Sequence, residues 1–390
     1  MRAFGRYAVV MKIRTHWSAI IVLSLGMLAV APSNRPTADT LFAKGHFEAA
    51  YHAYKAEVAV SPESVSALLG LGTIELYRNQ LDKAKQHLQR VLALDPANGI
   101  AKGRLRALAD RVGGAHDYRI VDEPSVVRIP FVLDPLPVIS VTINGHRATM
   151  LVDTGAPGIG LSQAFVRRLG LRTTLAGRGV FAGGRTAGIY TTRVGKMVIG
   201  SLQVAGIPAQ VFPGIPVDGI VGTGFLSHFL TTIDYAHKVL VLKPRAFSPI
   251  FEQRMNAVGA VSVPMLLVGD HFIFSKATVN SGDAGWFHID TGAPFGIQLT
   301  KASIAASHSV VDPKKAKTVM GPGGPTHILE FTAANVALGR YVVRNVDGVY
   351  FMDGDQYGIF PFTVSGTLSQ AYFARAAVTF DFAAMRMVIR

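Results

Sequence analysis

The chain contains no cysteine among its 390 residues. That absence excludes a disulfide framework, a thiolate nucleophile and any metal site built on thiolate ligands. The sequence also lacks the His-Glu-x-x-His pattern of zinc hydrolases and the Gly-x-Ser-x-Gly pattern of serine hydrolases. Its twelve histidines are scattered, and its Gly-x-Gly triplets do not follow a strand and open a helix. We therefore expect no metal, no nucleotide and no other cofactor.

Charged residues are scarce at 16% of the chain, and acids are the scarcer sign. Lys and Arg number 39 against 25 Asp and Glu, which gives a formal net charge of +14. The basic residues form no long run and do not alternate with aromatic residues, so the charge does not indicate a nucleic-acid surface. A hydrophobic fraction of 49% predicts large buried cores and argues against disorder.

The N-terminus carries an uncharged apolar stretch, Ser18–Ala31, behind a basic segment. The stretch ends in Ala-Val-Ala before Pro32, which is a small-x-small cleavage pattern. This order predicts a secretory signal peptide over residues 1–31. The stretch is shorter than the roughly 20 residues that a membrane span needs, but an uncleaved anchor is the alternative. Both predict a periplasmic, secreted or outward-facing protein, and a membrane is a partner only if the anchor stays.

Residues 38–111 show helical periodicity with few Pro and Gly residues. Positions recur at an offset of 34, the period of tetratricopeptide repeats. The matching pairs are Phe47 with Leu81, Ala50 with Ala84, and Pro62 with Pro96. The segment resembles two such repeats, which would offer a groove to a peptide or partner protein, and a plain helical spacer is the alternative. Because repeats usually need three copies to be stable alone, we expect this unit to pack against the next domain and to be stabilised by it.

Residues 112–127, with a Gly pair and Pro, are predicted to be a linker.

From about residue 128 the pattern changes to short strands that occur in two colinear sets. Each set holds the pentapeptide Asp-Thr-Gly-Ala-Pro after an apolar run, at 153–157 and at 290–294. Two further blocks recur in the same order, 196–204 as 335–343 and 231–242 as 378–389. Colinear blocks with small changes in loop length indicate two copies of one fold, over 128–250 and 258–390. Asn144-Gly145 predicts a two-residue hairpin turn just before the first pentapeptide.

The repeated aspartates, Asp153 and Asp290, can supply acid–base chemistry if their loops face each other. Two carboxylates about 3 Å apart do not both ionise, so one keeps a proton. The ionised member can then take a proton from water while the protonated member hydrogen-bonds a scissile carbonyl. Glycine leaves room for backbone amides near the carboxylate, and threonine offers a hydroxyl that ties one loop to the other. The supporting loop residues are Thr154, Gly155, Thr291 and Gly292.

Both copies carry the Asp-Thr-Gly-Ala motif directly after an apolar residue, and Ile-Val-Gly follows the first copy at 220–222. On these motifs, residues 128–390 resemble a retropepsin-like (pepsin-superfamily) aspartyl protease with both lobes on one chain. The resemblance implies a multidomain chain in which an all-α helical repeat precedes a mainly-β double-lobed fold. It implies an Asp153/Asp290 dyad in cis, a peptide or protein substrate, no metal, and a flap near Gly183 and Gly184. A second flap is expected near 323–324.

The second copy departs from the family pattern, since the position expected for Ile-Val-Gly reads Ile359-Phe360-Pro361. Proline cannot donate a backbone hydrogen bond, so the support of Asp290 is expected to differ from that of Asp153. This departure motivates an alternative function, a non-catalytic module that binds extended peptides by strand addition. A further alternative pairs each lobe with a lobe of another chain. His288 and the recurrent Asp234 and Asp381 are interpreted as structural residues, the two acids as turn or strand-end groups.

Overall fold

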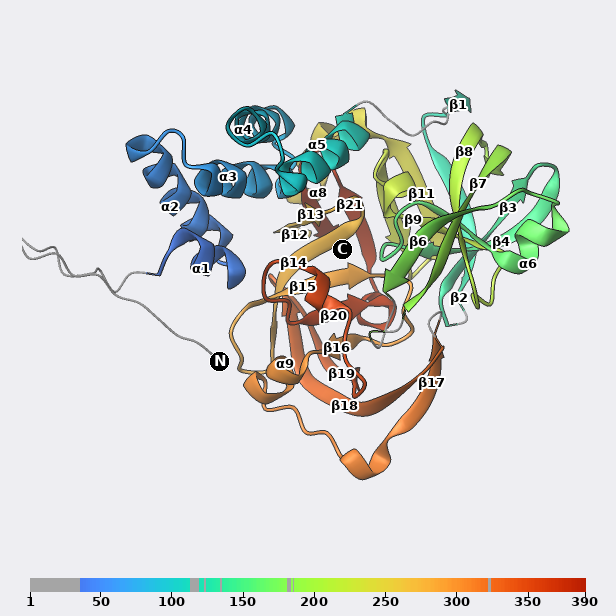
Figure 1. Ribbon diagram of the computed structural model, residues 1–390. Helices are drawn as coiled ribbons and strands as arrows, with labels where there is room; N and C mark the ends of the chain where they lie inside the picture. Colours follow the sequence, from blue (N-terminus) through green and yellow to red (C-terminus); the bar gives the residue numbers. More distant parts are fainter. Residues whose placement is uncertain are drawn as a thin grey trace, which may run out of the picture. The chain divides into compact units, whose positions relative to one another are not determined.

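The computed structural model describes residues 36–112, 119–122, 124–133, 135–180, 184, 186–321 and 324–390. A set of helices comes first along the chain, and a mainly-β region follows (Figure 1). The predicted signal segment 1–31 and the predicted flap residue Gly183 lie outside the described residues. Within the described ranges, no helix is long and apolar enough to cross a membrane.

The helical unit spans residues 38–112 and forms five helices within the described chain. They are α1 (Ala38–Ala43), α2 (Phe47–Val60), α3 (Val65–Tyr77), α4 (Leu81–Leu94) and α5 (Gly99–Val112). Helices α2 and α4 begin at Phe47 and Leu81, the two residues that the 34-residue offset pairs. Helices cross closely at Gly72, where an added Cβ would lie 2.9 Å from Leu88 Cγ. The glycine therefore permits the contact between α3 and α4.

The β region consists of two units of similar order and a set of linking strands. The first β unit (residues 137–226) holds β3 (Pro137–Ile143), β4 (His146–Asp153), β5 (Ile159–Ser162), α6 (Gln163–Arg168), β6 (Thr174–Val180), β7 (Thr186–Ile199), β8 (Leu202–Phe212), β9 (Gly219–Gly222) and α7 (Thr223–Leu226). The second β unit (residues 266–373) holds β13 (Leu266–Val268), β14 (Phe272–Val279), β15 (Gly285–Asp290), β16 (Ile297–Leu299), α9 (Lys301–Ala306), β17 (Lys317–Gly321), β18 (Gly324–Leu338), β19 (Tyr341–Phe351) and β20 (Gly366–Ser369).

Strand pairing in the two units is equivalent around the repeated motif. In the first unit β4 runs parallel to β9, and β9 pairs antiparallel with β5. In the second unit β15 runs parallel to β20, and β20 pairs antiparallel with β16. Asp153 lies opposite Gly222, and Asp290 lies opposite Ser369. The two aspartates therefore end equivalent strands, each supported by a parallel neighbour.

The linking strands join both units in a single antiparallel array, in the order β12-β22-β21-β10-β11-β2. They are β2 (Val127–Leu133), β10 (Phe229–Asp234), β11 (Val239–Pro244), β12 (Val261–Pro264), β21 (Ala377–Asp381) and β22 (Arg386–Ile389), with helix α8 (Ser248–Ala257) between β11 and β12. At the centre, Thr232 of β10 lies opposite Thr379 of β21, with their hydroxyl oxygens 2.7 Å apart. One hydrophobic core runs from Met150 through Phe380 to Ile289, so the two units share a core.

The hairpin turn and the turn acids are confirmed. Asn144 and Gly145 both have positive φ, at 50° and 85°, as a two-residue type I′ turn requires. Asp234 ends β10 and accepts a hydrogen bond from His237 N at 3.1 Å. Asp381 ends β21 and accepts from the amides of the two following alanines at 3.0 Å. Both carboxylates therefore close turns rather than enter a site.

The predicted linker 112–127 is wrong in part. Residues Arg119–Asp122 form strand β1, which pairs antiparallel with β8 and places Arg119 opposite Ala205. Two β-branched residues at 120 and 121 suit this short edge strand. The sequence did not predict this strand, because the Gly pair and the prolines near it are typical of loops.

The helical unit packs on the second β unit. Phe47 lies 5.0 Å from Phe362 and 5.4 Å from Trp286 between ring centroids. Trp286 Nε1 donates to Gly45 O at 2.7 Å, and Arg111 Nη2 donates to Leu267 O at 2.7 Å. The helices thus bury apolar surface against the β region.

Candidate active site

The two aspartates occupy equivalent loops, directly after β4 and β15. Asp153 Oδ1 accepts a hydrogen bond from Gly155 N at 2.7 Å, and Asp290 Oδ1 accepts one from Gly292 N at 2.8 Å. Each carboxyl group is therefore oriented by the amide two residues later in its own loop. This is the role that the Asp-Thr-Gly sequence predicts for glycine.

The loops face each other at their glycines. A Cβ added to Gly155 would lie 2.6 Å from Asp290 Cγ, and one added to Gly292 would overlap the carboxyl group of Asp153. Real Cβ atoms do not approach so closely, so only glycine fits at either position. Each glycine thus lies directly against the opposite aspartate, and the two carboxyl groups are neighbours.

Four buried hydrogen bonds hold the loops together through the two threonines. Thr154 N donates to Thr291 Oγ1 at 3.0 Å, and Thr291 N donates to Thr154 Oγ1 at 3.1 Å. Each hydroxyl in turn donates to a carbonyl of the opposite unit, Thr154 Oγ1 to Ile289 O at 2.8 Å and Thr291 Oγ1 to Val152 O at 3.0 Å. Both threonines satisfy a donor and an acceptor that would otherwise be buried alone. The predicted supporting residues therefore meet at one site.

The electrostatics of the pair favour a shared proton. Burial, the negative charge of Asp290 and a hydrogen bond from one carboxyl group to the other raise the pKa of Asp153 well above its ordinary value of 3.8. The Gly155 amide acts in the opposite direction and lowers that pKa. Because the raising effects prevail, Asp153 stays protonated at pH values where an exposed aspartate is ionised.

This proton predicts a pH-dependent stability. A carboxyl group with a raised pKa binds its proton more tightly in the folded chain, so its contribution is present below about pH 3.8 and is lost as pH rises through the folded pKa. We expect Asp153→Asn to be more stable than the wild type at neutral pH and to lose that advantage below about pH 4. Urea unfolding of both proteins between about pH 3 and 8 measures the difference. A constant difference across that range would contradict the raised pKa.

The strand beside each aspartate donates a backbone amide to the segment after its loop in both units, from Ser369 N to Gly296 O at 3.0 Å in the second, but the supporting hydroxyl groups differ. In the first unit Gly222 N donates to Gly158 O at 2.7 Å, and Thr223 Oγ1 donates to Thr154 O at 2.8 Å. In the second unit Ser369 Oγ donates to Ala293 O at 2.7 Å and also contacts Asp290 O. The second loop is therefore fully supported, with a serine hydroxyl in place of the glycine.

The prediction that Ile359-Phe360-Pro361 fills this position is wrong. That segment overlaps the 3₁₀ turn Tyr357–Ile359 and precedes β20, whereas Thr367, Leu368 and Ser369 pair with the Asp290 strand. The prediction failed because the chain between aspartate and supporting strand is longer in the second unit, and Ser replaces the diagnostic Gly. Pro361 therefore does not weaken the support of Asp290.

Comparison with known proteins finds a family profile that matches part of the chain. Residues 139–228 match the profile of the gag-polyprotein putative aspartyl protease family. The match spans 90 of the 390 residues. The matched residues include the first Asp-Thr-Gly-Ala motif and Ile-Val-Gly at 220–222. No curated protein matches the sequence.

Two solved structures match parts of the chain at low identity. A retropepsin-like aspartic protease from Rickettsia conorii is 20% identical, with a TM-score of 0.27, over 33% of this chain and 93% of that chain. Conglutin gamma, a basic 7S globulin from lupine seeds, is 12% identical, with a TM-score of 0.39, over 69% of this chain and 95% of that chain. The profile match thus covers nearly all of the first β unit, which follows the helices.

A cavity of about 930 Å³ opens beside the Asp290 loop. Its lining comes from Gly292–Phe295 of that loop, from strands β17 to β19 with Lys315 just before them, and from Leu136, which directly precedes the first unit. The apolar lining side chains are Leu136, Phe295, Val319, Met320, Ile328, Phe331, Val349 and Phe351. A pocket of this size and character suits a large apolar side chain that enters next to the carboxyl pair. Sequence reasoning did not find this pocket, because its residues come from strands far apart in the chain.

Two hairpins are the candidate flaps. Strands β6 and β7 form the first, and Gly184 lies between them. Strands β17 and β18 form the second, where Gly321 lies opposite Gly324. Met320, next to that turn, lines the cavity although it is 77% exposed. The second hairpin therefore borders the pocket beside Asp290.

His288 is a buried structural residue, as the sequence suggested. Its ring packs 5.6 Å from Phe274 and 5.4 Å from Phe272 between centroids. Burial lowers the pKa of His288 to about 4 against the opposing effect of Asp290, so the imidazole is neutral above that pH.

Among the described residues, no group of three or more His, Asp or Glu side chains could hold a metal ion.

Proposed function

We propose that the protein is an exported aspartic endopeptidase in which Asp153 and Asp290 of one chain form the dyad. The reciprocal packing of each motif glycine on the opposite aspartate carries this proposal. The threonine hydrogen bonds within the chain support a dyad in cis rather than one shared between chains. A peptide or protein is the expected substrate, since the protease family acts on such chains.

The dyad works through one shared proton. Burial favours Asp153 as its holder, so Asp153 hydrogen-bonds the scissile carbonyl oxygen and polarises that bond. Asp290 accepts a proton from a water whose oxygen attacks the carbonyl carbon. The tetrahedral intermediate collapses when the leaving nitrogen takes a proton from the pair, which frees the amine product. Every step uses carboxyl groups that the loops already hold in place.

The apolar cavity beside Asp290 would bind one substrate side chain next to the scissile bond. Its lining predicts large aliphatic or aromatic residues there, because burying such a side chain gains roughly 1.5–3 kcal/mol. The two flap hairpins would close over the peptide backbone.

Incubation with a mixture of unstructured peptides tests the proposal. We expect new termini in the mass spectrum after incubation between about pH 3 and 7, where one carboxyl of such a pair is protonated. Peptides recovered intact over that whole range, from protein shown to be folded, would refute the peptidase.

The alternative of a non-catalytic peptide-binding module loses one of its two motivations. It rested on Pro361 as the support of Asp290 and on the flanks of the second copy that the first does not match. Ser369 occupies the supporting position and donates to the loop. Tight binding of a peptide that is recovered unchanged remains the result that would favour this alternative.

A glycine variant tests whether each loop lies against the aspartate of the other loop. Gly292→Ala places a methyl group against the Asp153 carboxyl and should lower kcat about 100-fold, the cost of misplacing a reacting group by about 1 Å. Gly158→Ala is the matched control, because no atom lies within 4 Å of its added Cβ. Equal rates for the two variants in a peptide-cleavage assay would show that the loops do not face each other.

Export is proposed from the sequence of the first 31 residues. N-terminal sequencing of the protein recovered outside the cytoplasm should begin at Pro32. A longer N-terminus in the membrane fraction would instead favour the uncleaved anchor.

A further inference from the structure

The two catalytic strands have equivalent outer faces. In the second β unit Phe274 lies opposite His288, which lies opposite Thr367, so these side chains share one face. Asp290 and Ser369 lie two residues further along the same strands and therefore on the same face. In the first unit the matching residues are Leu151 and Ile220. That unit covers them with its own side chains, Phe212, Leu136, Ile215 and Val217 among them.

The helical unit covers this face in the second unit. Phe274, Tyr357 and Phe362 belong to one apolar cluster with Phe42 of α1, Phe47 of α2 and Tyr77 of α3. Ring centroids of Phe274 and Phe362 are 5.3 Å apart, and those of Phe362 and Tyr77 are 6.2 Å apart. The helices therefore replace, beneath Asp290, the cover that the first unit provides for itself beneath Asp153.

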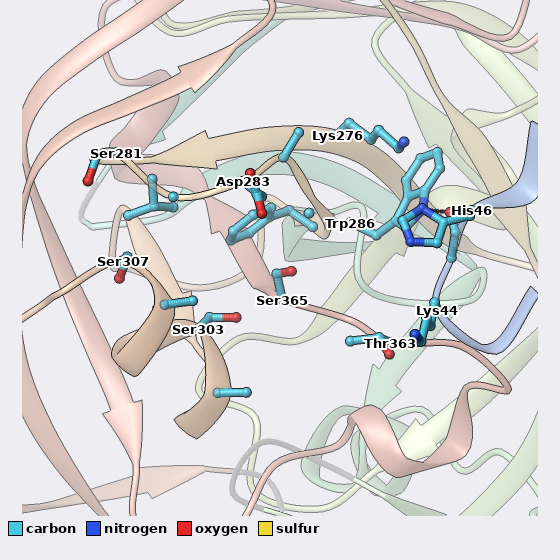
Figure 2. Close-up of a pocket in the computed structure, with 18 residues that line it drawn as sticks. Lys44, His46, Lys276, Ser281, Asp283, Trp286, Ser303, Ser307, Thr363 and Ser365 are labelled. Carbon is cyan, nitrogen blue, oxygen red and sulfur yellow. Dashed lines mark hydrogen bonds between the residues drawn. The ribbon is translucent and has the colours of Figure 1, made fainter. Parts of the chain in front are cut away.

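The turn between α1 and α2 holds both strands of the Asp290 site at their N-terminal ends. Trp286, four residues before Asp290 on β15, donates from Nε1 to Gly45 O at 2.7 Å. Thr363, just before β20, donates from its amide to Ala43 O at 2.8 Å. Figure 2 shows Trp286 beside His46 and above Thr363 and Lys44, at the edge of a pocket of about 470 Å³ between the helical turn and the second unit. The same helical turn thus fixes the starts of both the catalytic and the supporting strand.

Tyr357 connects this cluster to the supporting strand by a polar contact. Its side chain is buried in the cluster, and its hydroxyl lies 2.6 Å from Thr367 Oγ1. Thr367 precedes by two residues Ser369, whose hydroxyl holds the Asp290 loop. A continuous set of contacts therefore leads from the helices through Tyr357 and β20 to the loop of Asp290.

We infer that the helical unit is a positioning element of the active site, and that Tyr357 is the positioning residue through which it holds β20 and Asp290. The inference rests on the proposed peptidase function. It also means that the apolar faces of α1 and α3 pack against another part of the same chain. Those faces are covered by the second β unit and are not open to a peptide or partner protein.

A pair of tyrosine variants tests the inference in the full-length protein. Tyr357→Phe removes the hydroxyl that contacts Thr367 and should lower kcat about tenfold while KM changes less than about twofold, because substrate contacts stay in place. Tyr372→Phe is the matched control. It is also buried, and its hydroxyl contacts carbonyls of β18 and β19, Val336 O at 3.4 Å and Tyr341 O at 3.2 Å, instead of Thr367. We expect this control to keep the wild-type kcat. Equal kcat values for the two variants would overturn the inference.

Hydrogen exchange separates this inference from the peptidase proposal. Amides of residues 287–293 and 366–369 should exchange faster in Tyr357→Phe than in Tyr372→Phe, whether or not the protein cleaves peptides. Unchanged exchange would overturn the positioning role, whereas an inactive wild type would refute only the peptidase. If Tyr357→Phe does not fold, Trp286→Phe is measured in the same way; it removes the indole hydrogen bond to Gly45 O and part of the ring that packs on Phe47.

Discussion

Asp153→Asn and Asp290→Asn should each lower kcat for peptide hydrolysis by about 1,000-fold or more, because each removes half of the acid–base pair. An asparagine amide can hydrogen-bond the glycine two residues later, as the aspartate does, so the loops should keep their conformation. It can neither take a proton from water nor share one with the remaining carboxyl group. The loss should therefore appear in kcat, with little change in KM.

Asp234→Asn is the matched control for those variants. Asp234 also ends a strand and accepts a hydrogen bond from an amide of the following turn, but it lies in the linking sheet. We expect its activity to stay within about twofold of the wild type, since the asparagine oxygen can accept the same bond. Activity in either dyad variant comparable with that of Asp234→Asn would rule out the dyad. Circular dichroism of all three variants checks that they are folded.

Thr154→Val should destabilise the protein by about 3 kcal/mol. The variant leaves Thr291 N without its acceptor and Ile289 O without its donor, and each buried unpaired group costs about 1–3 kcal/mol. Thr154→Ser keeps the hydroxyl and should retain most of the stability. Urea unfolding of the two variants at one pH gives the comparison. Equal midpoints would show that the hydroxyl does not join the loops.

The matching variant in the other loop provides a coupling test. Thr291→Val should cost about as much as Thr154→Val, because its hydroxyl makes the symmetric pair of bonds. The double variant should cost less than the sum of the two, since both hydroxyl groups hold the same pair of loops and removing either one already loosens the contact between them. Strict additivity would indicate that the two threonines act independently.

The sequence predicted those parts of the site that depend on local chemistry. The repeated pentapeptide identified both aspartates, the threonines that join the loops and the glycines that face the carboxyl groups, because each role needs one residue type at one position. The Asn144-Gly145 turn was equally predictable, since both residues need positive φ. The turn acids Asp234 and Asp381 were also interpreted correctly, because a short carboxylate at a strand end commonly closes a turn.

Features that depend on contacts distant in sequence were missed. Ser369 was overlooked because its support comes from a side-chain hydroxyl, which does not share the Ile-Val-Gly pattern of the first unit. The cavity beside Asp290 is built from strands that only the sheet register brings together. Tyr357 has no motif of its own, and its relation to Thr367 appears only once the helices and the second unit are packed.

Mixing inactive chains tests most directly the claim that Asp153 and Asp290 of one chain form a single dyad. Chains with Asp153→Asn are co-expressed with chains with Asp290→Asn, and peptide hydrolysis by the mixture is compared with that of each variant alone. A dyad in cis leaves every chain with one carboxyl group, so the mixture should be as inactive as the separate variants. Recovery of a substantial fraction of wild-type activity would contradict the account, because it requires Asp290 of one chain to work with Asp153 of another.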